Sequence, residues 1–193
     1  MGHGGQRMTW LLAACTPKND VEVDPELVPF EVREIDSALF LETGASSAES
    51  GQGVGMLLMS DDEVSCEQYE AAFGDSYYTS TLLAGRGSLF SDSIGLVVIF
   101  SWSHDQGENA GWEGDYAVFS TAESERGSLE RGAWVLPFAD GQTWLGRAGG
   151  YARIDDNSGS IEGHVETRAI EATFDAEYCG KMSGDYYAGH SGR

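Results

Sequence analysis

The sequence predicts an all-β fold with one short helix, arranged as an antiparallel β-sandwich, with a β-barrel as the alternative. Short runs in which every second residue is apolar recur along the chain, and this is the pattern of half-buried strands. Many of the 26 glycines fall between these runs, where tight reversals need them. A hydrophobic content of 41% argues against a disordered chain.

The alternating runs give the positions of the expected strands. They cover residues 38–42, 53–60, 77–83, 94–102, 116–120, 133–138, 144–154, 160–167 and 169–178. The run 94–102 is apolar on both faces, so we expect it to be a central strand. Asp140-Gly141 predicts a two-residue hairpin turn, because both central positions of a type I′ turn need a positive φ.

The one helix is expected to begin near residue 66. Ser65 and Gln68 have the spacing of a capping box, in which each side chain binds the other residue's backbone N–H. Cys66, Tyr69 and Phe73 then recur at i, i+3 and i+7. This spacing places Cys66 on the buried face of the helix.

The first residues have the order of parts of a secretory signal: Arg7, a short apolar run over 8–14, and small residues before Cys15. The run is too short to span a bilayer, which takes about 20 residues. Leu12-Ala13-Ala14-Cys15 resembles the lipobox of bacterial lipoproteins. The resemblance implies that 1–14 is a signal peptide, that cleavage precedes Cys15, and that its thiol carries diacylglycerol. The alternative is an ordinary thiol at a frayed terminus.

Domain organisation and location follow from this anchor. Thr16, rather than aspartate, comes after Cys15, and this resembles lipoproteins sorted to the outer membrane. We therefore expect an extracytoplasmic, membrane-anchored protein. The acidic, proline-containing residues 15–31 are expected to be a tether, and 32–193 a single β-domain.

The other two cysteines, Cys66 and Cys179, are expected to form a disulfide, since an exported chain folds in an oxidising compartment. Two buried thiols are the alternative. The net charge of −21 makes nucleic acid an improbable partner and disfavours direct adsorption to anionic head groups. The expected membrane contact is therefore the lipid on Cys15.

Two stretches carry candidate ligand-binding residues. The segment 103–115 holds carboxylates and a histidine, together with Trp112 as a surface for stacking. These polar candidates are His104, Asp105, Glu108, Glu113 and Asp115. Oxygen-rich side chains favour Ca²⁺ as a cofactor, and a solvated acidic loop is the alternative. Glu162, His164 and Glu166 alternate along one predicted strand and should share a face, as a metal or proton-transfer site or as an ordinary solvent face.

The sequence contains no G-x-S-x-G, H-E-x-x-H, phosphate-loop or dinucleotide fingerprint. We therefore expect a non-enzymatic binding or structural role in the cell envelope, with an envelope protein or a glycan as partner. The alternative is a lipid-anchored hydrolase that acts on glycans through paired carboxylates. Two carboxylates about 5 to 10 Å apart in a tryptophan-lined cleft would favour the hydrolase, and carboxylates dispersed on a convex surface would favour the binding module.

Overall fold

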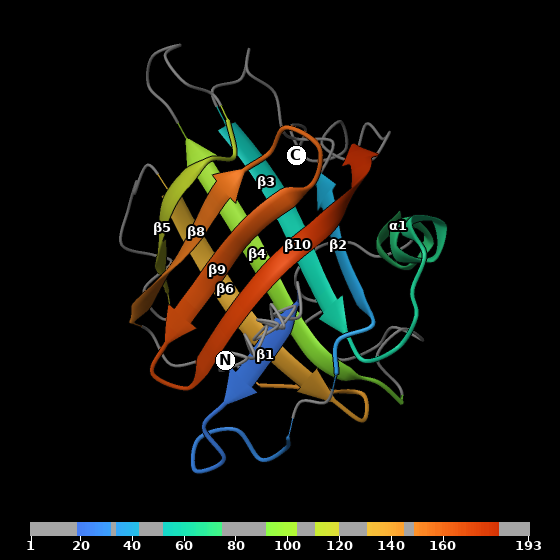
Figure 1. Cartoon of the computed structure of the whole chain (residues 1–193), viewed down its shortest axis with the longest axis vertical. Coiled ribbons are helices and arrows are strands. Elements are labelled where there is room, and N and C mark those ends of the chain that lie inside the picture. Colours follow the sequence, from blue (N-terminus) through green and yellow to red (C-terminus); the bar gives the residue numbers. More distant parts are fainter. Residues whose placement is uncertain are drawn as a thin grey trace, which may run out of the picture.

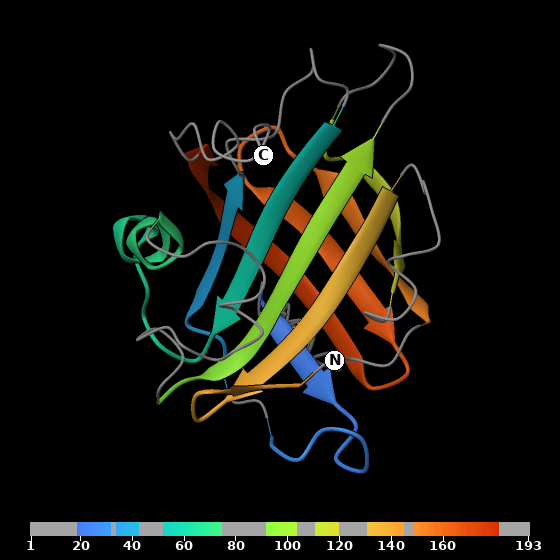
Figure 2. The same cartoon turned by 180° about the vertical axis from the view of Figure 1, so that it is seen from behind.

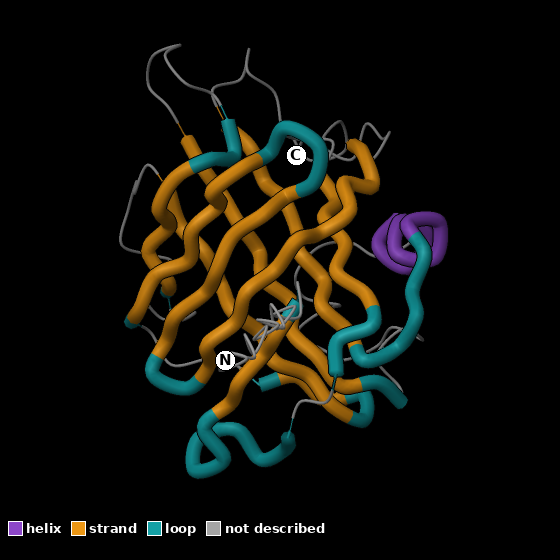
Figure 3. The backbone as a smooth tube through the Cα atoms, viewed as in Figure 1, coloured by secondary structure: helices purple, strands orange, loops and turns teal. Residues whose placement is uncertain are grey.

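The computed structural model describes residues 19–31, 34–42, 52–74, 92–103, 111–119, 131–144 and 149–181. Nearly all of this part is β-structure, with one short helix, as the sequence predicts (Figures 1 and 3). The elements are β1 (Asp20–Val23), β2 (Ser37–Glu42), β3 (Gln52–Ser60), α1 (Cys66–Gly74), β4 (Ile94–Ser103), β5 (Gly114–Val118), β6 (Arg131–Ala139), β7 (Gln142–Thr143), β8 (Gly150–Asp156), β9 (Ile161–Thr167) and β10 (Ile170–Lys181).

The strands form a closed barrel rather than a sandwich (Figures 1 and 2). The order around the barrel is β10-β2-β3-β4-β6-β5-β8-β9, and β9 pairs again with β10, so one sheet closes on itself. The first expectation, a sandwich, is therefore corrected to the alternative. Two neighbouring pairs, β10 with β2 and β5 with β6, are parallel, so the sheet is not wholly antiparallel.

Aromatic side chains fill the barrel. Phe100 packs against Tyr116 with ring centroids 4.9 Å apart, and Phe40 packs against Trp112 at 5.2 Å. All four residues are buried. An eight-stranded barrel is just wide enough for its own side chains, so these rings occupy the centre as a packed core. Gly55 makes room for them, because a Cβ at that position would lie only 2.9 Å from Cη2 of Trp112.

A second apolar cluster lies outside the barrel, on the outer face of β2, β3, β4 and β6. The helix α1 packs here through Tyr69, which is fully buried and donates a hydrogen bond from its hydroxyl to the carbonyl of Met56 at 3.1 Å. The capping box is confirmed: Ser65 N donates to Gln68 Oε1 at 2.9 Å, and Gln68 N donates to Ser65 Oγ at 3.3 Å.

The structure joins Cys66 and Cys179 by a disulfide, with the two Cα atoms 5.1 Å apart, as the cysteine count predicts. The bond ties the start of α1 to β10, beside the parallel pairing of β10 with β2.

Residues 19–31 are part of the barrel, not a free tether. β1 pairs antiparallel with the first half of β10, and Asp24 N donates to the carbonyl of Ala169 at 2.8 Å. Val21 and Val28 are 6% and 3% exposed and join the barrel core. The expected boundary at residue 32 therefore moves towards the N-terminus, to about Asn19. Isolated valines between acidic residues and prolines have the appearance of a linker, and only the pairing with β10 reveals their role.

Most predicted strands lie where the alternation puts them. The predicted strand at 144–154 begins later, at Gly150, and the one at 77–83 lies outside the described residues. The Asp140-Gly141 turn is confirmed, since both residues have positive φ, 49° and 72°, and the turn joins β6 to β7. Among the described helical residues, none forms a helix long and apolar enough to cross a membrane.

Candidate functional site

The outer face of β5, β8 and β9 brings together residues from both candidate stretches. Asp115 on β5 lies opposite Arg153 on β8, and Arg153 lies opposite His164 on β9. The three side chains therefore form one row across the sheet. The order of the strands sets this row, because β8 separates β5 from β9.

Ion pairs connect this row. Arg153 Nε lies 2.7 Å from Asp155 Oδ1, and Arg153 Nη1 lies 3.4 Å from Asp115 Oδ1. His164 Nδ1 lies 3.4 Å from the other oxygen of Asp155. The Arg153 side chain is 49% exposed, so solvent screens these pairs and each adds little to stability.

A second pair lies two residues further along β8 and β9, on the same face. The Tyr151 hydroxyl donates to Glu166 Oε2 at 2.9 Å, and this hydrogen bond to a carboxylate, together with its charge, raises the pKa of Tyr151. The Tyr151 ring meets the His164 ring edge-on at 5.3 Å. The neighbouring residues Ile161 and Val165 point into the barrel and are buried. The polar stripe is thus the outer face of β9, as its alternation predicts.

Carboxylates lie opposite one another on the neighbouring strands β8, β9, β10 and β1. Glu162 lies between Asp156 and Asp175, and Glu166 lies opposite Glu171, which in turn lies opposite Glu22 on β1. Like charges directly opposite one another in a sheet are destabilising. These opposed carboxylates make the outer surface of β1, β10, β9 and β8 strongly acidic.

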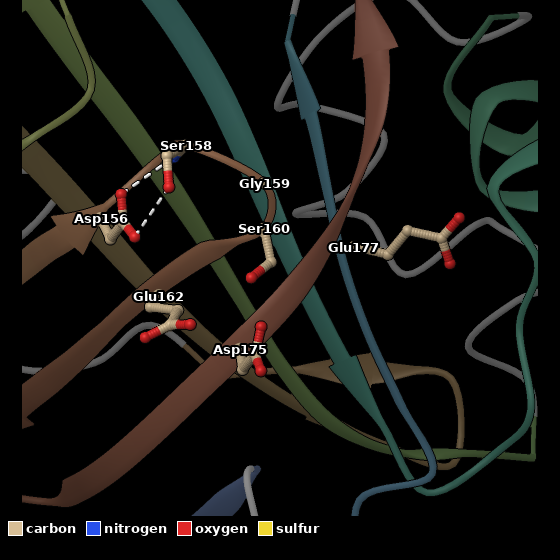
Figure 4. Close-up of a pocket in the computed structure, with 7 residues that line it drawn as sticks. All are labelled: Asp156, Ser158, Gly159, Ser160, Glu162, Asp175 and Glu177. Atoms are coloured by element: carbon tan, nitrogen blue, oxygen red, sulfur yellow. Dashed lines mark hydrogen bonds between the residues drawn. The ribbon is translucent and has the colours of Figure 1, made fainter.

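A hollow of about 540 Å³ lies at one end of this surface (Figure 4). Its lining residues are Asp156, Ser158, Gly159, Ser160, Glu162, Asp175 and Glu177. Asp156 accepts hydrogen bonds from Ser158 N at 2.9 Å and from Ser158 Oγ at 3.0 Å, and these bonds lower the pKa of Asp156. In Figure 4 Glu177 points away from the other carboxylates. Within the described part of the chain, no group of three or more His, Cys, Asp or Glu side chains is arranged to hold a metal ion.

The segment 103–115 is only partly described. His104, Asp105 and Glu108 lie outside the described residues, so the calcium prediction has no geometry there. Glu113 is exposed, and Asp115 is paired with Arg153.

Trp112, which was expected to be a stacking surface, lies in the barrel core. It is 8% exposed, and its ring packs edge-on against Trp102 at 6.1 Å.

Sequence reasoning did not select Tyr151, Arg153 and Asp155. Their alternation over 150–156 predicts an outward face as clearly as that of β9 does. Their partners, however, depend on the register of the β8–β9 hairpin, which contains a bulge between Ile154 and Asp156.

A buried tyrosine hydroxyl lies in the barrel core. The Tyr116 hydroxyl donates to the carbonyl of Trp112 at 2.6 Å and accepts from Arg131 Nη1 at 2.9 Å. Burial raises the pKa of Tyr116 to about 12, against the opposing effect of the Arg131 charge.

Alkaline pH should therefore weaken the fold through Tyr116. The folded protein holds this phenolic proton more tightly than the unfolded chain, whose tyrosines titrate near pH 10. The contribution to stability is therefore complete below about pH 10 and is lost as the pH rises towards 12, by about 2 to 3 kcal/mol. Urea unfolding at pH 8, 10 and 11.5 measures this loss. The free energy of unfolding of Tyr116→Phe should decline less steeply with pH than that of the wild-type protein. Equal declines in the two proteins would contradict the role given to Tyr116.

The comparisons with known proteins give no relative. No family model, curated protein or solved structure matches this chain significantly.

Proposed function

We propose that this protein is a lipid-anchored, extracytoplasmic β-barrel with a non-enzymatic binding or structural role in the cell envelope. The observation that supports the non-enzymatic part is the position of the candidate carboxylates. Asp115, Glu162 and Glu166 lie on the outer surface of a closed barrel whose interior is filled by its own side chains.

A glycan hydrolase needs a different arrangement. Two carboxylates must flank one glycosidic bond, and sugar rings are commonly held against exposed aromatic faces. Here Trp102 and Trp112 are 6% and 8% exposed and lie inside the barrel. The acidic hollow is lined by carboxylates, serines and a glycine, without an aromatic residue. This geometry favours the binding module.

The cysteines support export and anchoring. The chain has three, and the disulfide between Cys66 and Cys179 leaves Cys15 for a separate role. A disulfide is typical of proteins that fold outside the cytoplasm. A thiol that follows Leu12-Ala13-Ala14 is then accounted for by acylation, and several acyl chains together give firm membrane attachment.

Replacing Cys15 by serine should move the protein from the membrane fraction to the soluble fraction, because the acyl chains have no other attachment point. Detergent phase partitioning measures this, with metabolic labelling by a fatty acid as a second readout. The double variant Cys66→Ala, Cys179→Ala is the control and should stay with the membranes. Continued partitioning of Cys15→Ser into detergent would contradict the anchor.

The purified protein should release no reducing sugar ends from insoluble cell-wall glycan. Co-sedimentation with the glycan in the same experiment would identify glycan as the partner, and its absence would point to an envelope protein. Release of reducing ends by the wild-type protein, and its loss in Glu162→Gln or Glu166→Gln, would instead establish the hydrolase. Thr173→Ala, which alters an exposed residue on the same outer face, is the matched control.

A further inference from the structure

We infer that the anchored barrel lies on its side, with the wall formed by β1 and β10 against zwitterionic lipid head groups. The inference rests on the proposed acylation of Cys15. The surface of the barrel that meets the bilayer determines which surfaces are left for partners.

A short length of chain joins the lipid on Cys15 to the barrel. Asn19 is already held by the barrel, since its side-chain Oδ1 accepts a hydrogen bond from Asp175 N at 2.8 Å. Only four residue steps separate Cys15 from Asn19. Such a connection spans at most about 14 Å even when fully extended. Asn19 must therefore lie within about 14 Å of the acylated cysteine.

This connection reaches the barrel partway along its wall. Asp20 lies opposite Thr173, well inside the length of β10, and β1 begins partway up the barrel wall (Figure 1). From Thr173 the strand continues for eight more residues to Lys181. At about 3.3 Å per residue and a tilt near 40°, these residues rise about 20 Å along the barrel axis. The connection is too short to reach a bilayer placed against that end.

The opposite end is also unfavourable. β1 runs towards it, and residues 24–31 continue beyond β1 as the lowest loop in Figure 1. This loop is held to the barrel by the hydrogen bond from Asp24 N to Ala169 O and by the buried Val28. A bilayer at this end would meet the loop and its exposed Glu26 first. The connection would then have to stay almost fully extended, which is entropically costly. The side-on arrangement needs no such extension.

The negative charge of the β1–β10 wall determines which lipid head groups it can approach. The wall near Asn19 carries Asp20, Glu22, Glu171 and Asp175, and anionic head groups would repel these carboxylates within about 8 Å at physiological salt. Zwitterionic head groups carry no net charge and do not repel them. The wall is therefore expected to approach a phosphatidylcholine surface more closely than one rich in anionic lipid.

Two single-cysteine labels test the orientation. Thr173→Cys lies on β10 beside Asp20, and Ala117→Cys lies on β5, three strands around the barrel. Both positions are exposed. The native cysteines are acylated or disulfide-bonded, so a thiol-reactive fluorophore reacts only with the new thiol. The full-length lipidated protein is reconstituted in phosphatidylcholine vesicles that carry a head-group spin label.

The label at Thr173→Cys should lose more fluorescence than the label at Ala117→Cys. Equal losses, or a greater loss at Ala117→Cys, would overturn the side-on orientation. Failure of the wild-type chain to float with vesicles would instead refute the acylation and the inference with it. A flexible Gly/Ser insertion of 12 residues between Lys18 and Asn19 adds an average reach of about 19 Å and should abolish the difference between the labels. Persistence of the difference with this insertion would show that the short connection does not set the orientation, and would overturn the inference.

Discussion

Replacing Trp112 by alanine is expected to lower the free energy of unfolding by about 3 to 5 kcal/mol. Trp112 is 8% exposed, and its ring contacts Phe40 at 5.2 Å and Trp102 at 6.1 Å inside the closed barrel. The strands around it are fixed by their hydrogen bonds, so the wall has little freedom to collapse into the cavity that the indole would leave. Urea unfolding followed by circular dichroism measures the loss.

Tyr151→Ala is the matched control, because Tyr151 is also a large aromatic residue but is 40% exposed on the outer face. Its replacement should cost less than about 1 kcal/mol. Trp112→Phe should retain much of the stability, since a smaller ring fills part of the space. If Trp112→Ala unfolds at the wild-type urea concentration, the indole is not a core residue, and its role as a ligand-stacking surface would again be open.

Period-two alternation identified the residues of most strands and correctly put Glu162, His164 and Glu166 on one outer face, with Ile161 and Val165 inside. Alternation shows which face a side chain occupies but not which strand lies beside it.

Closure of the barrel depends on such a pairing. Leu39 on β2 lies opposite Glu177 on β10, at the other end of the chain. No local pattern distinguishes this contact from the edge of a sandwich, so both architectures fit the same sequence.

The remaining differences have a similar origin. Val21 and Val28 lie among acidic residues and prolines, and they join the barrel core where β1 pairs with β10. Trp112 precedes a strand within an acidic, glycine-rich stretch, and its ring lies inside the barrel beside Gly55, where a Cβ would crowd it. The partners of His164 likewise depend on the bulge in β8. Each is a contact between segments far apart in sequence, or a detail of register.

Removing the disulfide by the double change Cys66→Ala, Cys179→Ala is expected to lower the free energy of unfolding by about 2 to 5 kcal/mol. The two cysteines are 113 residues apart, so the bond strongly restricts the unfolded chain. For a chain of this size the loss corresponds to a decrease in Tm of roughly 5 to 20 °C. Differential scanning calorimetry measures it, and the wild-type protein with a reductant should show the same Tm as the variant. An unchanged Tm in both would contradict a stabilising bond.

The local loss of stability in this double variant should be greatest where β10 pairs with β2. This parallel pairing joins only a few residues and contains an irregularity between Tyr178 and Gly180, next to Cys179. Besides the backbone hydrogen bonds, the side chain of Glu42 on β2 contacts β10. It accepts a hydrogen bond from the Tyr178 hydroxyl at 2.9 Å, and its Oε1 lies 3.5 Å from Lys181 Nζ. Amide hydrogen exchange in the double variant should therefore accelerate more in β2 than in β4, which is paired along its whole length with β3 and β6. Equal acceleration in the two strands would mean that the bond acts only through the unfolded chain, whereas a preferential effect on β2 would establish that it also holds the barrel closed.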